Sequence, residues 1–298
     1  MSGRTIGLRL AMLAVCLCVA TTATAGDRVD ETRKVEKDAK ISIDNLAGTI
    51  EVIGWDKHEV RIQCDLDPKA KKLEITGGEG DLGIKVKYPR KIRGEFKGSE
   101  LVVQVPHGCR VETESVSADV SVRGVDGKVG IESVSGEIAV RGNPRSLEIA
   151  SISGLIDVDA ETDDVEIESV SGDIFLQNVR KRLSVSSVSG DVEIKAETLD
   201  TFSFNVVSGE LDLTARPTQQ GRWNIDCHSG EVTLYLPADV DAEFEIDSFS
   251  GDIDDGFGHE ASRTGRYTPG KELSFTQGAG GARIKVSVFS GDVRIVKR

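Results

Sequence analysis

The fold is decided by the phrase SVSGDIFL, residues 169–176, because close copies of it recur through the chain. Its nearest copies are SVSADVSV from Ser115, SVSGEIAV from Ser133, SISGLIDV from Ser151 and SVSGDVEI from Ser187. More distant copies are NLAGTIEV from Asn45, VVSGELDL from Val206, CHSGEVTL from Cys227, SFSGDIDD from Ser248 and VFSGDVRI from Val288. Such self-similarity indicates a repeat architecture.

The spacing between copies is constant through the middle of the chain. The central residue of the phrase returns at one unchanging step, at Ala118, Gly136, Gly154, Gly172 and Gly190. The steps then lengthen slightly, to Gly209, Gly230 and Gly251, and the last step, to Gly291, leaves room for two units or for a long insertion. Five in-phase copies at one spacing predict tandem structural units.

Within a unit, the apolar residues change their alternation once. Val165 and Ile167 share one face of an extended segment, and the next apolar face holds Val170, Gly172, Ile174 and Leu176. The offset of three between Ile167 and Val170 marks a corner or bulge, because the side chains of a strand alternate with period two. The sequence therefore predicts two short strands in each unit of 18–21 residues.

One such unit cannot bury its apolar face alone, whereas stacked units share a continuous core. We therefore predict an all-β repeat fold, a β-helix-like solenoid whose rungs stack at about 4.8 Å. The left-handed hexapeptide helix is excluded because the inner positions do not recur at every sixth residue. The calcium-binding nonapeptide solenoid is excluded because GGxGxD is approached only once, at residues 77–81.

Residues 1–25 are typical of a secretory signal peptide. Arg4 and Arg9 give a positive start, residues 10–20 form an apolar run, and the Ala-Thr-Ala triplet ending at Ala25 precedes Gly26. The run is shorter than the roughly 20 residues that span a bilayer, so cleavage between Ala25 and Gly26 is favoured over an uncleaved anchor. We expect an exported, soluble chain in the periplasm or outside the cell, without a transmembrane segment after signal removal.

The remaining boundaries follow from where the phrase is present. Residues 26–39 are expected to form an N-terminal linker, and residues 40–298 the β-strand-repeat domain. The phrase is lost over residues 55–110, which predicts an irregular segment there. The long last step predicts an inserted loop or hairpin over residues 252–283.

Three cysteines remain after signal removal, namely Cys64, Cys109 and Cys227. An oxidising compartment permits one disulfide, and we favour Cys64 with Cys109 because both lie in the N-terminal third. No CxxC or Cys/His spacing indicates zinc, so no metal site and no cofactor is predicted. The four histidines are scattered, at His58, His107, His228 and His259.

The centre of the phrase combines serine, glycine and an acid. We interpret the glycine as an inward position where the chain bends or a neighbouring wall approaches. The flanking serines, such as Ser169 and Ser171, are expected to point outward and to hydrogen-bond along the stack. The residue after the glycine is acidic at Asp119, Glu137, Asp173, Asp191, Glu210, Glu231, Asp252 and Asp292.

Directly stacked carboxylates about 5 Å apart repel one another by roughly 0.8 kcal/mol in water. We interpret this acidic row as a solvated face that prevents edge aggregation. A ladder of bound cations, compensation by basic neighbours and antiparallel pairing are the alternatives.

No catalytic centre is predicted. Serine occurs in nearly every copy of the phrase, which is the opposite of a unique nucleophile. The paired acids Asp163-Asp164 and Asp254-Asp255 are of the kind that β-helical polysaccharide enzymes use, but adjacent strand residues point to opposite faces. His228 occupies a position filled by Val, Ile or Phe in other copies, so we interpret it as a core histidine rather than a ligand.

Composition limits the partners of the chain. It has 298 residues, with 50 acidic and 37 basic side chains and a formal net charge of −13. Such a field repels polyanions, so nucleic acid is excluded as a partner. One basic stretch, residues 56–103, is either a surface for anionic envelope polymers or lipid headgroups or an irregular cap with a solvated face. Hydrophobic residues make up 38% and aromatic residues 5%, which predicts an aliphatic core.

Three C-terminal features add to the repeated phrase. They are GRYTPG at residues 265–270, GAGGARI at residues 278–284 and FSGD at residues 289–292. Together these motifs resemble the bacterial putative-adhesin β-strand-repeat family, a domain of unknown function in exported and membrane-associated proteins. The resemblance covers roughly residues 40–298 and implies a β-strand-repeat scaffold without assigned catalytic residues, so no site residue is transferred from it.

We expect an exported, non-enzymatic binding or scaffold protein of the bacterial envelope. Its partner is expected to be an envelope glycan, a protein or a lipid headgroup. The alternatives are a β-helical carbohydrate-active enzyme that uses outward acids and, as the family resemblance implies, an accessory protein of envelope-stress signalling.

Overall fold

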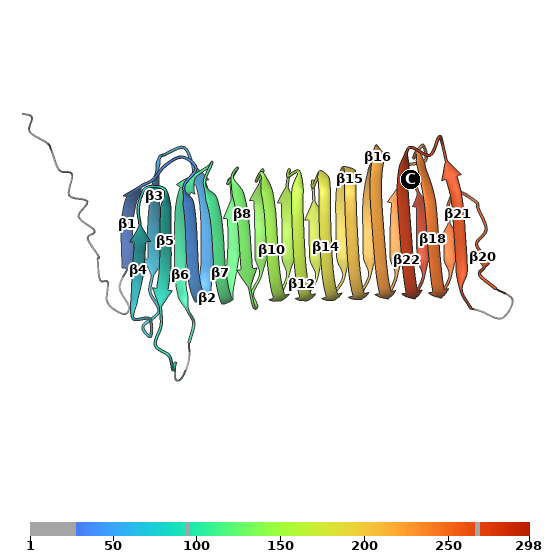
Figure 1. Cartoon of the computed structure of the whole chain (residues 1–298). Helices are drawn as coiled ribbons and strands as arrows, with labels where there is room; N and C mark the ends of the chain where they lie inside the picture. The colour runs from blue at the N-terminus through green and yellow to red at the C-terminus, as the bar shows by residue number, and fades with distance from the viewer. Residues whose placement is uncertain (1–27, 93, 95, 266–268) are drawn as a thin grey trace, which may run out of the picture.

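The structure is a computed structural model that describes residues 28–92, 94, 96–265 and 269–298. These residues form 23 β-strands and contain no helix, so the all-β prediction is confirmed. The strands lie side by side along one long axis, from β1 at one end to β20 and β21 at the other (Figure 1). The expected signal peptide and its cleavage site between Ala25 and Gly26 lie outside the described residues.

The regular centre alternates between two ladders of strands. The first ladder contains β8 (Lys128–Ser133), β10 (Ser146–Ser153), β12 (Asp164–Ser171) and β14 (Lys181–Ser189). The second ladder contains β9 (Ile138–Gly142), β11 (Ile156–Ala160) and β13 (Ile174–Gln177). Four longer strands contribute to both ladders, namely β2 (Lys40–Trp55), β7 (Arg110–Arg123), β15 (Val192–Ser208) and β16 (Leu211–Ser229).

Strands of successive repeats pair in parallel, in register at one repeat length. Leu147 lies opposite Val165, and Val165 lies opposite Leu183. In the second ladder, Ile156 lies opposite Ile174. Equivalent positions of successive repeats therefore stack directly on one another, and each apolar row continues from repeat to repeat.

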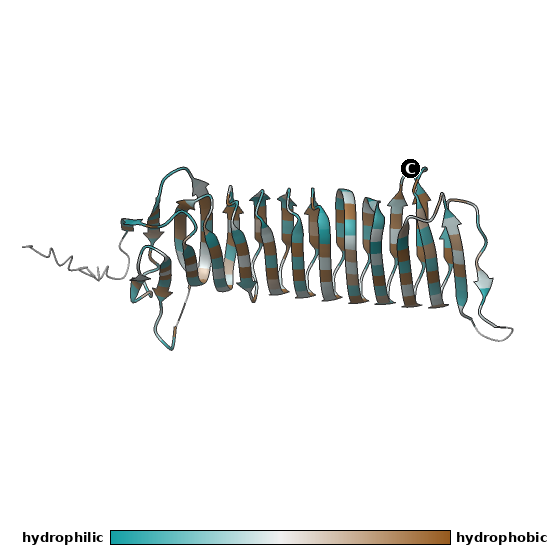
Figure 2. Cartoon of the chain, turned by 45° about the horizontal axis from the view of Figure 1, so that its top comes forward, coloured by the Kyte–Doolittle hydropathy of each residue, from teal (hydrophilic) through white to brown (hydrophobic). Residues whose placement is uncertain are grey.

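The core lies between the inward faces of the two ladders. It is mainly aliphatic, and Ile174 and Leu176 are buried as predicted. The bulkiest buried side chains, Trp223, Phe202, Phe204 and Phe244, all lie in the C-terminal half. Figure 2 shows the resulting alternation of hydrophobic and hydrophilic bands along the strands.

The corner of each repeat lies later than the sequence predicts. Ile167 and Ser169 both point inward, so the alternation of β12 continues to Ser169. Val170 consequently points outward with 47% of its surface exposed, and its predicted inner position is wrong. The break comes at Gly172, whose φ of 124° turns the chain before Ile174 resumes the inner face.

Glycine is required at this corner. In nine copies of the phrase its φ lies between 104° and 158°, a range that residues with a side chain rarely adopt. A Cβ atom on Gly172 would lie 2.1 Å from the carbonyl oxygen of Gly154 in the neighbouring repeat. The glycine thus occupies a corner packed against backbone, not the inner face. Ala118 is the exception because β7 continues through this position without a positive φ.

The two serines of the phrase have different roles. The first is buried at Ser133, Ser151, Ser169 and Ser187, which corrects the predicted outward position of Ser169. The Oγ of Ser187 donates to the carbonyl oxygen of Ser189 at 3.1 Å, across the corner. The second serine stays outside, and the Oγ of Ser171 donates to the carbonyl oxygen of Ile152 in the preceding repeat at 3.3 Å. The prediction of serine hydrogen bonds along the stack is therefore confirmed for Ser171.

The acid after the glycine also bonds along the stack. The Oδ1 of Asp119 accepts the backbone N–H of Glu137 at 2.9 Å, and the Oδ1 of Asp292 accepts that of Asp252 at 2.8 Å. These carboxylates satisfy corner amides of the adjacent repeat, which gives the row a structural role. In the described part of the chain, no group of three or more His, Cys, Asp or Glu is placed to hold a metal ion.

Antiparallel strands close the N-terminal end of both ladders. The strands at this end are β1 (Arg28–Lys34), β3 (Glu59–Asp65), β4 (Lys72–Gly77), β5 (Asp81–Lys87) and β6 (Ser99–Pro106). β5 and β6 extend the two halves of β2 in parallel, β4 is antiparallel to β5, and β3 is antiparallel to both β6 and β1. The structure therefore differs from the expected linker over 26–39 and from the expected irregular segment over 55–110. The phrase is absent there because β3 and β4 pair antiparallel with β6 and β5, and because a long connection between Lys87 and Ser99 replaces the tight corner between β5 and β6, which both run parallel to β2.

The C-terminal end has a different strand order in space than in sequence. Its strands are β17 (Val232–Leu236), β18 (Ala242–Ser250), β19 (Ile253–Asp255), β20 (Ser262–Arg263), β21 (Lys271–Gln277), β22 (Ala282–Ser290) and β23 (Val293–Lys297). β22 lies between β16 and β18 and pairs in parallel with both, and β23 lies in the same way between β17 and β19. β21 is antiparallel to β18 on its outer side, so the expected insertion over 252–283 holds β19, β20 and β21 at this end of the stack.

The disulfide suggested by the sequence is absent, because Cys64, Cys109 and Cys227 are all buried free thiols. Cys64 pairs with Leu101 near the start of β6, whereas Cys109 follows the end of this strand. The five steps from Leu101 to Pro106 span about 17 Å at the rise of a β-strand. A disulfide needs Cα atoms within about 7 Å, so the topology keeps these two cysteines apart.

We expect these thiols to be unreactive in the folded chain. Burial raises the pKa of the Cys64 thiol from 9.0 to about 12 and that of Cys109 to about 11. The thiolate is the reactive form, so labelling of Cys64 near pH 8 should be about a thousandfold slower than labelling of an exposed cysteine. In the chain over residues 26–298, Ellman's reagent should detect no thiol in the native protein and three thiols after denaturation without reductant. Detection of a single thiol after denaturation would instead indicate a disulfide between two of the three cysteines.

Candidate functional site

A continuous row of outward apolar side chains runs along the first ladder. It consists of the residue two places before the corner position of each repeat. In spatial order its members are Leu46, Val116, Val134, Ile152, Val170, Val188, Val207, His228, Phe289 and Phe249. Eight of the nine large hydrophobic side chains that are exposed in the described residues belong to this row, at 41–54% exposure. We call it the apolar stripe.

The stripe is a consequence of the late corner. Since the strand alternation continues to the buried Ser169, the following residue, Val170, must point outward. The parallel register of the repeats then stacks Ile152, Val170 and Val188 side by side. Sequence reasoning missed the stripe because it placed the corner three residues too early. The signal that was available is Ser169 itself, since extending the alternation of Val165 and Ile167 by two residues ends on this serine.

The C-terminal end of the stripe is aromatic. The ring of His228 stacks on Phe289 with centroids 4.9 Å apart, and Phe289 stacks on Phe249 at 5.0 Å. His228 is exposed and is not the core histidine that the sequence predicts. A hollow of about 630 Å³ borders these rings, and Lys271 of the C-terminal insertion forms part of its wall.

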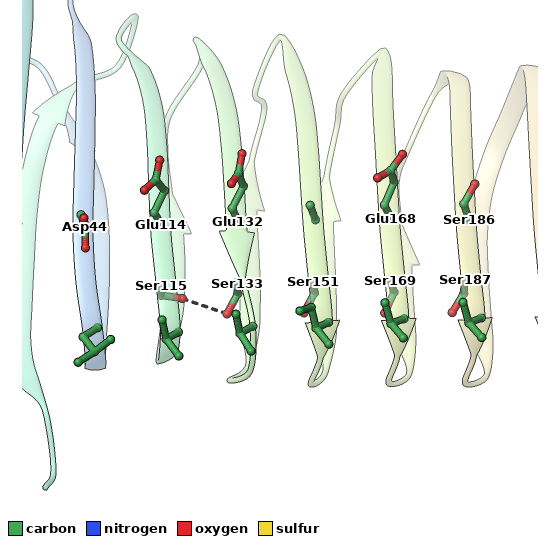
Figure 3. A pocket seen from close by; sticks show the side chains of 17 residues that line it. Asp44, Glu114, Ser115, Glu132, Ser133, Ser151, Glu168, Ser169, Ser186 and Ser187 are labelled. Carbon is green, nitrogen blue, oxygen red and sulfur yellow. Dashed lines mark hydrogen bonds between the residues drawn. The ribbon is translucent and has the colours of Figure 1, made fainter. Parts of the chain in front are cut away.

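The aliphatic end of the stripe borders a shallow groove of about 720 Å³. Its other side is the row of residues two places earlier on the same strands, namely Asp44, Glu114, Glu132, Ala150, Glu168 and Ser186. We call these residues the flanking row. Figure 3 shows the carboxylates of Glu114, Glu132 and Glu168 aligned above the serines of the phrase. No lysine or arginine of the described chain lines this groove.

The groove is electrostatically negative. Asp44 forms an ion pair with Lys85, but Glu132 and Glu168 have no cation within ion-pair distance among the described residues. The corner acids, such as Asp173 and Asp191, follow the stripe positions by three residues, beyond the glycine corner, and their Oδ1 atoms accept backbone N–H groups of the next repeat. The carboxylates that border the stripe in this groove are therefore those of the flanking row.

The paired acids of the sequence do not form a joint site. Asp163 pairs with Lys181, and Asp164 pairs with Arg182 at 3.4 Å. Asp255 accepts the backbone N–H of Phe257 at 3.1 Å and lies 2.8 Å from the Nδ1 of His259. The contacts of Asp163 and Asp164 join successive repeats, whereas those of Asp255 stabilise the turn after β19. The two acid pairs therefore lie on different repeats, beside β12 and β19.

The basic stretch over residues 56–103 is partly neutralised within its own fold. Lys72 and Lys87 both pair with Glu74, at 2.9 and 3.1 Å. The hydrogen bonds from these two ammonium groups keep the pKa of Glu74 below its usual value. Together with the Lys85–Asp44 pair, these contacts weaken this stretch as a surface for anionic polymers.

Two further observations come from known proteins. The sequence model described as Toastrack DUF4097 matches residues 39–296, which confirms the family resemblance predicted from the repeated phrases. Among curated protein sequences, none matches the chain.

In the part of the chain that the structure describes, no helix has the length and apolar character needed to cross a membrane.

Several solved structures are distantly similar. A putative lipid binding protein from Parabacteroides distasonis ATCC 8503 is 15% identical with a TM-score of 0.40, over 92% of this chain and 97% of the other. A putative adhesin from the same strain is 13% identical with a TM-score of 0.37, over 92% and 99%. A putative adhesin from Bacteroides fragilis NCTC 9343 is 10% identical with a TM-score of 0.36, over 91% and 98%.

Proposed function

We propose that this chain, which belongs to the Toastrack DUF4097 family, is a non-enzymatic binding scaffold of the bacterial envelope. In this proposal the stacked repeats form a β-solenoid that holds an elongated ligand along the apolar stripe. The supporting observation is that nearly all large exposed hydrophobic side chains of the described residues gather in this one row. Single exposed hydrophobic residues are common on proteins, whereas contiguous exposed apolar patches are typical of interaction sites.

The shape of the stripe favours an elongated ligand. From Leu46 to Val188 the row advances by five strand spacings, or about 24 Å at roughly 4.8 Å for each spacing. The groove along this part is shallow and open at its sides, so a compact small molecule would leave most of it unused. A chain-like ligand would instead contact every repeat.

Export is part of the same proposal. The basic start, short apolar run and Ala25–Gly26 junction of the sequence support a secreted chain. We infer a periplasmic or extracellular location, where the partner would be another component of the envelope. A carbohydrate-active enzyme is less well supported, since its acids would have to converge across a substrate. Here Asp163 and Asp164 form ion pairs with the next repeat, and Asp255 bonds within a turn.

We expect the neutral dye Nile red to bind the chain over residues 26–298 at the stripe. The double substitution Ile152→Ser and Val170→Ser removes two central members of the stripe and should weaken dye binding by about tenfold. The reason is that each substitution removes apolar contact area, which is worth roughly 25 cal/mol per Å². Fluorescence titration gives the affinity. Phe175→Ser is the matched control, because among the described residues Phe175 is the one large exposed hydrophobic side chain outside the stripe. Equal effects of the double variant and the control would contradict the proposal.

The natural partner class can be screened with the same proteins. The chain over residues 26–298 and the Ile152→Ser/Val170→Ser variant are tested against peptidoglycan fragments, soluble glycans and lipid vesicles. Saturable binding that the variant loses supports a scaffold that acts through the stripe. Turnover of a glycan, abolished by replacing outward acids, would support the enzyme instead.

A further inference from the structure

The charges around the stripe point to a specific kind of occupant. Resting on the proposed function, we propose that the stripe binds a basic amphipathic α-helix of a partner protein. The apolar face of this helix would lie on the aliphatic residues from Val116 to Val188. Lysine or arginine side chains on one flank of the helix would then face the carboxylates of the flanking row.

Charge complementarity is the first argument. The flanking row, with Glu132 and Glu168 among its acids, borders the stripe along one side of the groove. A helix with one apolar face bordered by cations has the complementary pattern. Since Glu132 and Glu168 have no internal ion pair among the described residues, they are available for a cationic partner.

The backbone of the ladder gives the second argument. Along the stripe, backbone N–H and C=O groups are already paired with the strands on both sides, so only side chains are offered to a ligand. A partner bound here must satisfy its own backbone hydrogen bonds, as a helix does and an isolated extended peptide does not.

The spacing of the repeats also favours a helix. One helical turn rises about 5.4 Å, close to the strand spacing of about 4.8 Å, whereas same-face residues of an extended chain lie about 6.7 Å apart. Over five strand spacings, the same-face residues of a helix fall out of register with the stripe residues by about 3 Å, whereas those of an extended chain do so by roughly 9 Å. The distance of about 24 Å between Leu46 and Val188 corresponds to about 16 helical residues.

The same charges argue against two other occupants. A second copy of this chain would bring a second set of carboxylates against Glu132 and Glu168, and like charges in contact are unfavourable. An anionic lipid surface would be repelled for the same reason, and the whole chain is strongly acidic.

The test uses a fluorescein-labelled peptide of Leu and Lys about five helical turns long, designed with one leucine face flanked by lysines. Two comparison peptides are its Leu/Glu counterpart and a sequence-permuted Leu/Lys peptide without an apolar face. By fluorescence anisotropy, the Leu/Lys helix should bind at least about tenfold more tightly than either comparison peptide. Circular dichroism should show that helix content of the peptide rises on binding, and binding should weaken in high salt because the charges are exposed.

Charge-matched variants locate the contact. Glu132→Gln/Glu168→Gln removes two acids of the flanking row and should weaken binding of the Leu/Lys peptide by about three- to tenfold. Glu148→Gln/Glu166→Gln removes two exposed acids from the same ladder that lie two residues further from the stripe, and it should change affinity less than about twofold. If both double variants weaken binding equally, the effect depends only on net charge, and the proposal is overturned.

The outcomes separate this inference from the proposed function. If Nile red binds at the stripe and the Leu/Lys helix does not bind, the scaffold function stands and the helical partner is wrong. If the protein binds vesicles of anionic phospholipid in preference to the Leu/Lys peptide, the helical partner is also wrong and a lipid surface is the occupant. If Ile152→Ser/Val170→Ser changes neither dye nor peptide binding, the proposed function fails as well.

Discussion

Replacing Gly172 with alanine should destabilise the protein by about 3 kcal/mol or more, because two unfavourable effects act at this corner. The residue has a φ of 124°, which residues with a side chain rarely adopt. The added Cβ would also lie 2.1 Å from the carbonyl oxygen of Gly154. This oxygen belongs to the backbone of the adjacent repeat, so the contact is relieved only by moving the stack. Urea unfolding followed by circular dichroism measures the loss.

Gly130→Ala is the matched control for the corner substitution. Gly130 lies on β8, within the same stacked region, and an added Cβ would meet only the Cγ of Glu112 at 3.8 Å. We expect its stability to change by less than about 1 kcal/mol, since glycine is not needed there. If Gly172→Ala behaves like Gly130→Ala, the corner tolerates a side chain and our account of the glycine row is wrong.

Ending the chain at Gly281 should abolish stable folding of its C-terminal third. The removed strands β22 and β23 contribute six buried apolar residues, namely Ala282, Ile284, Val286, Val288, Val293 and Ile295. Their burial is worth about 10 kcal/mol, as large as the whole stability of a typical domain. The loss also separates β18 from β16, because β22 pairs with both. Size-exclusion chromatography and thermal unfolding should show aggregation and a lower midpoint.

An internal deletion of similar size provides the control. Residues 146–163 form one complete repeat, and the register that sets Leu147 opposite Val165 places residue 164 where residue 146 lay. Removing them should preserve a folded monomer, because β8 can then pair with β12 as it pairs with β10. A stable monomer from the chain that ends at Gly281, or aggregation of the internal deletion, would contradict this account of the stack.

Much of the fold was predictable because the same local pattern recurs in each repeat, so every copy supports the same assignment. The spacing from Ala118 to Gly190 sets the parallel register, and the buried Ile174 and Leu176 confirm one apolar face. The prediction failed at Val170, since a hydrophobic residue beside a polar serine was assigned to the core. Serine at position 169 is buried because it continues the inward alternation of Val165 and Ile167, and hydropathy alone does not report this.

The candidate site depended on the same assignment. Shifting the corner from between Ile167 and Val170 to Gly172 turns one inner row into an exposed one and moves His228 from the core to the surface. The closing strands were less predictable for a different reason. Antiparallel pairing of β3 and β6, and the insertion of β22, depend on contacts between distant residues that leave no periodic trace in the sequence.

The position of β22 has a consequence for biosynthesis. Repeats up to β16 can assemble in the order of the sequence, but β18 lacks its parallel neighbour until β22 has joined the stack. A polypeptide that ends before β22 would therefore keep unpaired strand edges that proteases and chaperones recognise. Docking of β22 is thus a condition for closing this end of the molecule.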